Sequence, residues 1–184
     1  NLSIEAIRQD RARGASALAR RALKLLARAA RTWPARDVAE LREQLLDFAD
    51  ALSAARPSMT PVGQLLRRWR KSCQHSFDFG LDDARGAASA QADALIAASR
   101  QAVDRCARHA ARLLGPDRTL LTHSLSATVV ATCRLLKNAG LRMIVTEARP
   151  LAEGRQLAER LSGWGVPTTY ITDAQSGLFV AQAD

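Results

Sequence analysis

The chain has 184 residues, 47% of them hydrophobic and 24% charged, which is the balance of a globular protein with one large domain or two small ones. The sequence has neither the roughly 18 consecutive apolar residues that span a bilayer nor a secretory leader, so we expect a soluble, cytoplasmic protein. Three widely spaced cysteines without a CxxC pair predict no disulfide framework and no zinc site, and we expect no metal and no cofactor. Cys106 and Cys133 are expected to be buried thiols.

The net charge of +9 is concentrated in the N-terminal part. Residues 1–116 contain 20 Lys and Arg against 12 Asp and Glu, whereas residues 117–184 contain 7 against 6. The one dense basic cluster, Arg67 to Lys71, includes Trp69. Solvated helix faces account for this pattern, but a phosphate-rich partner such as tRNA or a nucleotide is a second interpretation, because basic patches attract polyanions. An RNA-binding helical protein therefore stays among the alternatives.

The first two-thirds of the chain has the apolar spacing of three or four residues that predicts consecutive helices. The first helix ends before Pro34 and the second before Pro57, while the third begins at Pro61 and ends around Gln74. A longer fourth helix, from about residue 88 to 114, ends at Gly115. The apolar stripes are, in chain order, Ala15, Leu18, Ala22, Leu25 and Ala29; Val38, Leu41, Leu45, Phe48 and Leu52; Val62, Leu65, Leu66 and Trp69; and Ala92, Leu95, Ile96, Ser99, Val103, Cys106, Ala110 and Leu113.

After Pro116 short β-rich runs at 120–122, 143–146 and 168–172 alternate with helical stretches. This β-α-β-α-β order predicts a parallel sheet with right-handed crossovers, which binds ligands outside the carboxyl ends of its strands. We therefore predict an α/β chain with a helical N-terminal domain at residues 1–116 and the first half of a Rossmann-like phosphate-ligand domain at residues 117–184. Three strands leave a sheet edge that needs cover, so we expect the chain to be truncated after this first half.

The segments at the strand ends resemble one superfamily. Leu-Leu-Thr-His-Ser-Leu-Ser at 120–126, Val-Thr-Glu-Ala-Arg-Pro at 145–150 with Glu-Gly-Arg at 153–155, and the segment from Gly165 to Ala174 are similar, in order and spacing, to motifs of methylthioribose-1-phosphate isomerases, ribose-1,5-bisphosphate isomerases and the alpha, beta and delta subunits of eukaryotic initiation factor 2B. Upstream, Arg-Gly-Ala at 13–15 and Arg-Pro-Ser at 56–58 resemble a helix-starting turn and a second turn of the same superfamily. The resemblance implies a phosphorylated sugar or nucleotide as ligand.

General physical arguments give several of these residues a role at an anion site. Gly14 lets the backbone approach a ligand at a helix start, and Arg13 adds positive charge there. Ser124 and Ser126 lie where a strand becomes a helix, so that hydroxyl and amide groups face a phosphate, or else they cap the helix. Arg149 is a candidate phosphate clamp. The candidate ligand-binding residues are Arg13, Gly14, Ala15, Arg56, His123, Ser124, Ser126, Glu147, Arg149, Gly154 and Asp173.

Each of these roles has an ordinary structural alternative. Gly14 fits a routine loop, and Arg149 fits a surface ion pair with Glu147. His123 fits a structural histidine at a strand end, and Asp173 could either bind sugar hydroxyls or cap the next helix.

The resemblance implies aldose-to-ketose conversion in the isomerase branches, with a catalytic Cys at the position of Ser124 and an Asp in the part of the domain that follows. Ser124 departs from that pattern, and the segment that would carry the Asp lies beyond residue 184. A thiol with a pKa of about 8.5 exchanges protons near neutrality, whereas a hydroxyl needs an adjacent base. We therefore favour a regulatory or divergent member that forms a homo-oligomer, as the resemblance implies. An active sugar-phosphate isomerase using Ser124 is the alternative.

Overall fold

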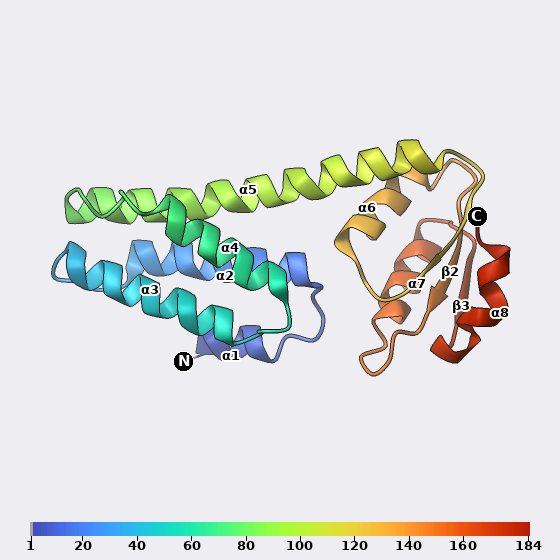
Figure 1. The fold of residues 1–184 in the computed structure, drawn as a ribbon, viewed down its shortest axis with the longest axis horizontal. Coiled ribbons are helices and arrows are strands. Elements are labelled where there is room, and N and C mark those ends of the chain that lie inside the picture. The colour runs from blue at the N-terminus through green and yellow to red at the C-terminus, as the bar shows by residue number, and fades with distance from the viewer. Residues whose placement is uncertain (1) are drawn as a thin grey trace. The chain divides into compact units, whose positions relative to one another are not determined.

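The computed structural model describes residues 2–184 and divides into two compact units, of which the first extends to Arg100 and the second begins at Gln101 (Figure 1). The elements are α1 (Leu2–Arg8), α2 (Ala15–Thr32), α3 (Val38–Ala54), α4 (Thr60–Ser72), α5 (Leu81–Leu114), β1 (Thr119–Thr122), α6 (Ala127–Leu136), β2 (Arg142–Thr146), α7 (Glu153–Gly163), β3 (Thr168–Ile171), the 3-10 helix η1 (Asp173–Gln175), α8 (Ser176–Phe179) and the 3-10 helix η2 (Val180–Gln182). The predicted α/β fold class is confirmed. The domain boundary at residues 116 and 117 stays a prediction.

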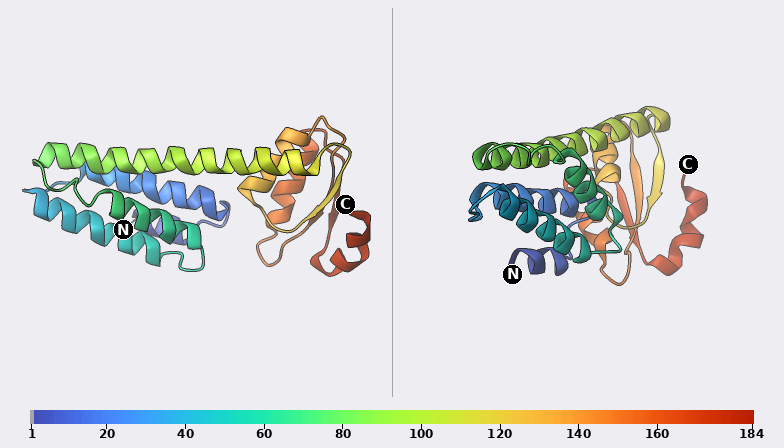
Figure 2. Two further views of the ribbon diagram at one scale, coloured as in Figure 1. Left: turned by 45° about the horizontal axis from the view of Figure 1, so that its top comes forward. Right: turned by 60° about the vertical axis from the view of Figure 1, so that its left-hand side comes forward.

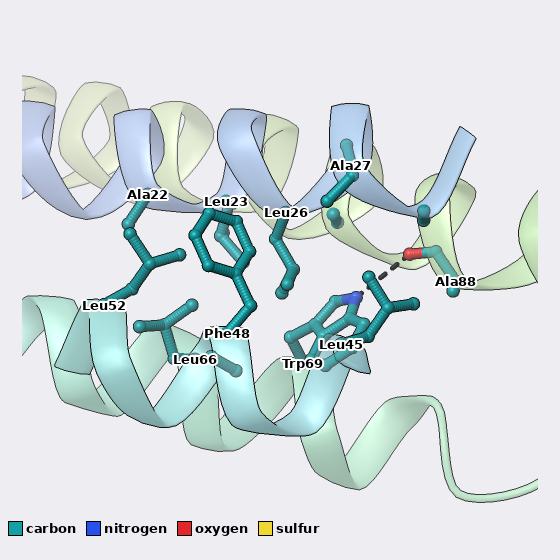
Figure 3. Packing of buried hydrophobic residues seen from close by; sticks show 14 of the residues in the cluster. Ala22, Leu23, Leu26, Ala27, Leu45, Phe48, Leu52, Leu66, Trp69 and Ala88 are labelled. Carbon is teal, nitrogen blue, oxygen red and sulfur yellow. Dashed lines mark hydrogen bonds between the residues drawn. The ribbon is translucent and has the colours of Figure 1, made fainter. Parts of the chain in front are cut away.

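The first unit is a helical bundle whose core comes from α2, α3 and α4, with α5 packed against them (Figure 3). The stripes predicted for these helices contribute to this core, but the fully buried Leu23 and Leu26 of α2 were not among the predicted residues, and Leu25 is only partly buried. Sequence signals fix several helix ends: the Asp37 carboxylate accepts from the Glu40 N–H at 2.8 Å at the start of α3, and Pro61 lies in the first turn of α4. Helix α1 was not predicted. Trp69 is fully buried, and its indole N–H donates to the Ala88 carbonyl at 2.9 Å. The aromatic residue of the basic cluster is therefore a core residue and offers no face to a nucleic-acid base.

Helix α5 begins at Leu81, before the predicted start, and the apolar stripe predicted for its second half is wrong. Cys106 is exposed and Leu113 is 82% exposed, whereas the neighbouring Ala107 is buried and Leu114 packs on the core of the second unit. The cause is the helical period. About 18 residues make five turns, so Leu114 shares the face of the buried Ile96, while Leu113 points about 100° away.

The second unit holds a parallel sheet in the order β1-β2-β3. Met143 and Val145 of β2 pack with Leu157 of α7 and Cys133 of α6 on one face. Ile144 points to the other face and is also buried, and α8 lies on that side, opposite α6 and α7 (Figures 1 and 2). Burial raises the pKa of the Cys133 thiol to about 11, as expected for a structural cysteine. Among the described residues, no helix combines the length and apolarity that a bilayer span requires.

Candidate functional site

The sheet register brings the ends of all three strands together. Thr122 pairs with Val145, so the next residue, His123, lies beside Thr146 at the end of β2. His123 Nδ1 is 2.7 Å from Thr146 Oγ1 and 3.6 Å from Oδ1 of Asp173, which follows β3. The His123 side chain is 61% exposed, so the imidazole links the strand ends and still faces solvent. The predicted meeting of His123 and Asp173 at the carboxyl edge is therefore present.

Asp173 uses both carboxylate oxygens to hold the loop after β2. Its Oδ1 accepts from the Ala148 N–H and its Oδ2 from the Arg149 N–H, each at 2.8 Å. The hydrogen bond from the Arg149 N–H is the largest influence on the pKa of Asp173 and holds it below its ordinary value, although desolvation raises it. Ala148, Thr146 and His123 lower this pKa further by smaller amounts. Thr172, rather than Asp173, caps the following 3-10 helix. Asp173 thus holds the β2–α7 loop in place, which differs from the helix capping considered from the sequence. Binding of sugar hydroxyls by Asp173 stays a prediction.

The lowered pKa of Asp173 predicts a pH-dependent contribution to stability. Because the folded-state pKa lies below the ordinary value of 3.8, the contribution is complete above that pH and is lost as pH falls through the lower folded value. Asp173→Asn replaces one acceptor by a donor, so the variant should melt at a lower temperature than the wild type at pH 7. The difference should shrink below about pH 3.8. Melting curves from pH 7 to pH 2 test this, with Glu159→Gln as the exposed-carboxylate control. A difference that stays constant over this range would remove the proposed role of the Asp173 charge.

Ser124 forms a hydrogen bond with Glu153, which was not among the predicted site residues. Its hydroxyl donates to Oε2 of Glu153, the first residue of α7, at 2.7 Å. The sequence signal for Glu153 was its place beside Gly154 in the Glu-Gly-Arg motif at residues 153–155. Only the fold shows that the Glu153 carboxylate reaches the end of β1. Ser126 caps α6, since its hydroxyl accepts from the Val129 N–H at 3.4 Å. Capping was the structural alternative for this serine.

Backbone strain gathers at the same edge. In the described part of the chain, four residues other than glycine have a left-handed backbone, and three of them follow β1 or β2: Ser124 (φ 68°), Ala148 (φ 59°) and Ala152 (φ 52°). Such conformations cost free energy and are frequent at functional sites. The strand-end loops are therefore held in shapes that ordinary turns avoid.

Glu147 and Arg149 form the ion pair that was the alternative reading of Arg149, with 3.1 Å between Nε and Oε2. The Arg149 side chain is 69% exposed, so the guanidinium is accessible to a ligand from solvent. Both residues line a cavity of about 710 Å³ beside α7, together with Arg155 and Tyr170. His123, Ser124 and Asp173 do not line this cavity, so Arg149 lies at the boundary between the strand-end edge and the cavity.

Gly154 has a packing role that the sequence did not reveal. It is buried, and a Cβ placed on it would lie 1.7 Å from the Thr146 carbonyl oxygen. Only glycine lets the start of α7 approach the end of β2 this closely. The Gly154 N–H also donates to the Glu147 carbonyl at 3.2 Å. Direct ligand contact by Gly154 stays a prediction.

The two N-terminal motifs meet within the first unit. The carboxylate of Asp10 accepts from Arg13 and Arg21, each at 2.7 Å, and a guanidinium N–H of Arg56 donates to the Asp10 carbonyl at 2.7 Å. Burial raises the pKa of Asp10, but the hydrogen bonds from Arg13 and Ala12 outweigh it and hold the pKa below its ordinary value. Asp10 was missed because only the fold brings it to these arginines.

Helix α2 begins at Ala15, and Gly14 is its N-cap residue without a side-chain cap. Gly14 has φ −65°, a value open to any residue, so the case for a special backbone there is weaker than the sequence suggested. Arg13, Gly14, Ala15 and Arg56 belong to the first unit and the strand ends to the second. That the two groups share one ligand stays a prediction.

A helical domain ahead of a parallel β-α-β-α-β sheet defines a Rossmann-like α/β protein, a class in which the carboxyl edge of the sheet is the usual place for a ligand. The family model of the initiation factor 2 subunit family matches residues 11–184. The chain therefore belongs to this family, and the resemblance drawn from the motifs is confirmed.

The chain is similar to family members with different names. It is 25% identical over 98% of its length to the ribose 1,5-bisphosphate isomerase of Pyrococcus furiosus, and 28% identical over 99% to the methylthioribose-1-phosphate isomerase of Herpetosiphon aurantiacus. It covers 57% and 54% of these two proteins, so it spans just over half the length of these curated relatives. The crystal structure of translation initiation factor eIF-2B from Pyrococcus horikoshii matches 99% of this chain and 62% of its own, with a TM-score of 0.82 at 26% identity.

Proposed function

We propose that the carboxyl edge of the sheet binds a phosphorylated sugar or nucleotide. The observation that carries this proposal is the convergence of three strand ends: His123 and Ser124 follow β1, Asp173 follows β3, and the exposed Arg149 follows β2. In an open parallel sheet this edge is where ligands bind. The hydroxyl, imidazole and carboxylate groups suit sugar hydroxyls, and the guanidinium suits phosphate. Two relatives named as isomerases of phosphorylated riboses support the same ligand class.

Binding without turnover is the version of this function that we favour. Ser124 stands where the isomerases are expected to have a Cys, and its hydroxyl is bonded to the Glu153 carboxylate. A serine hydroxyl gives up its proton far less readily than a cysteine thiol, so Ser124 is a poor replacement for a group that must exchange protons near neutral pH. The Ser124–Glu153 pair is therefore suited to holding a ligand hydroxyl rather than to exchanging its proton, and the protein acts as a regulatory or divergent member.

The isomerase alternative rests on a specific group as well. The Glu153 carboxylate lies beside Ser124, where it is placed to act as the general base toward a bound sugar. Two of the relatives are named as isomerases, and the acidic residue expected after residue 184 would complete this chemistry. Homo-oligomer formation and a cytoplasmic location belong to the same proposal.

Ligand binding and turnover can be measured in one set of samples. Ribose 1,5-bisphosphate, methylthioribose-1-phosphate and AMP are added separately to the protein, and melting temperature and phosphorus NMR spectra are recorded. We expect at least one compound to stabilise the fold, by about 2.7 kcal/mol at a hundred times its Kd, and no compound to be converted. Conversion that is lost in Glu153→Gln would establish the isomerase instead. Failure of every compound to shift the melting temperature would refute the binding proposal.

A further inference from the structure

A second concave surface lies on the second unit, away from the strand ends. It is a groove of about 530 Å³ whose lining comes from α5, α6 and the C-terminal end of α7, and we name it the α6 groove. Much of its lining is apolar: Val130, Ala131 and Leu135 of α6 and Ala107 of α5. Leu135 is 53% exposed, although it belongs to a helix whose opposite side packs on the sheet. The α6 groove shares no residue with the strand-end edge.

Cations line the α6 groove. Arg108, Arg134, Lys137 and Arg160 contribute to it and are exposed, and Asp104 is the acidic residue of the lining. Within residues 2–184, none of these four cations forms an ion pair or a side-chain hydrogen bond. Three of them belong to the seven Lys and Arg of residues 117–184, a segment whose net charge is only +1. The positive charge is therefore a local property of the groove.

The apolar lining and the unpaired cations together indicate which kind of molecule fits the α6 groove. A nucleic-acid backbone would use the cations but would leave Val130 and Leu135 facing water, and base stacking would need an aromatic face. The aromatic residue of the groove, Trp164, is partly buried against the core of the unit. An amphipathic helix satisfies both features, because its apolar stripe covers Leu135 while acidic side chains on its flanks reach the cations.

We propose that the α6 groove binds an acidic amphipathic helix of a partner protein. Alanines at positions 107, 127 and 131 of the lining leave room for the side chains of such a helix to approach α5 and α6. Arg134 on α6 and Arg160 on α7 come from two different helices, and the acidic flanks of the helix pair with them. This interaction is independent of the ligand site at the strand ends.

The probe for this proposal is a dye-labelled synthetic peptide of 16 residues with Leu at the spacing of one helix face and Glu at the remaining positions. We expect saturable binding by fluorescence anisotropy, and at least tenfold weaker binding to Arg134→Glu/Arg160→Glu. Arg112→Glu is the matched control, because Arg112 is an exposed α5 residue outside the groove lining, and its binding should stay within twofold of the wild type. Circular dichroism confirms that the exposed substitutions leave the fold intact.

Two further samples separate the occupants. A scrambled peptide of the same composition cannot form the apolar face, so it should bind at least tenfold more weakly. A single-stranded RNA of 12 nucleotides should bind no more tightly than the scrambled peptide. Equal binding of the scrambled and ordered peptides, or binding of RNA alone with the same loss in the double variant, would overturn the proposal.

Discussion

Gly154→Ala should lower the free energy of unfolding of the second unit by about 3 kcal/mol or more. The added Cβ would lie 1.7 Å from the Thr146 carbonyl oxygen and 2.9 Å from the Thr146 carbonyl carbon, and both atoms belong to the backbone of β2. No side-chain rotation can relieve such a contact. Helix α7 must move away from the sheet, and the packing of Leu157 against Met143 and Val145 must loosen with it. Urea titration followed by circular dichroism measures the loss.

The same helix supplies the control for this substitution. A Cβ on Gly163, the last residue of α7, would have no atom within 4 Å outside its immediate neighbours, and Gly163 has no left-handed backbone. Gly163→Ala should therefore change stability by less than about 1 kcal/mol, in the stabilising direction, because alanine favours a helix more than glycine does. Equal losses in the two variants would contradict the role of Gly154 as the residue that lets α7 approach β2.

Most of the fold was predictable because its signals are local. The stripes of α2, α3 and α4 repeat every three or four residues, and the proline and glycine positions mark their ends. The phase of α5 was not predictable by the same rule. Several stripes are compatible with an alanine-rich helix of 34 residues, and the one chosen drifts by about 20° every seven residues, so that it ends at Leu113, about 100° around the helix from the buried Ile96. The exposure of Cys106 and Leu113 follows from that drift.

Part of the candidate site was predictable for a topological reason. Parallel strands end at one edge of the sheet, so His123, Glu147 and Asp173 were expected to approach one another before any contact was known. The bonds between them were not predictable, because they depend on register and on loop shape. Asp173 holds the amides of the β2–α7 loop, and Glu153 reaches Ser124 across 29 positions of sequence.

The basic cluster of α4 shows why charge alone misleads. Trp69 stands among four cations in the sequence, a composition typical of nucleic-acid binding. In a helix, however, neighbouring residues point about 100° apart, so the indole enters the core while Arg68 and Arg70 remain exposed. The RNA-binding alternative therefore loses the aromatic residue that supported it.

Arg149→Ala should remove most of the stabilisation that a phosphorylated ligand provides. Alanine retains the backbone N–H that Asp173 accepts, and the exposed ion pair with Glu147 contributes at most about 1 kcal/mol, so the free variant should melt close to the wild type. A charge-assisted contact to phosphate contributes about 1.5–3 kcal/mol, which weakens binding roughly 10- to 100-fold when it is lost. Arg142→Ala is the control, since it removes the same charge at the opposite end of β2.

The ligand-induced shift of the melting temperature in these two variants tests the site at the strand ends most directly. At a ligand concentration of a hundred times the wild-type Kd, the stabilisation should fall from about 2.7 kcal/mol to between about 0.4 and 1.4 kcal/mol in Arg149→Ala. It should remain unchanged in Arg142→Ala. A full shift in Arg149→Ala, or an equal loss in both variants, would contradict a phosphate site at the carboxyl edge of the sheet.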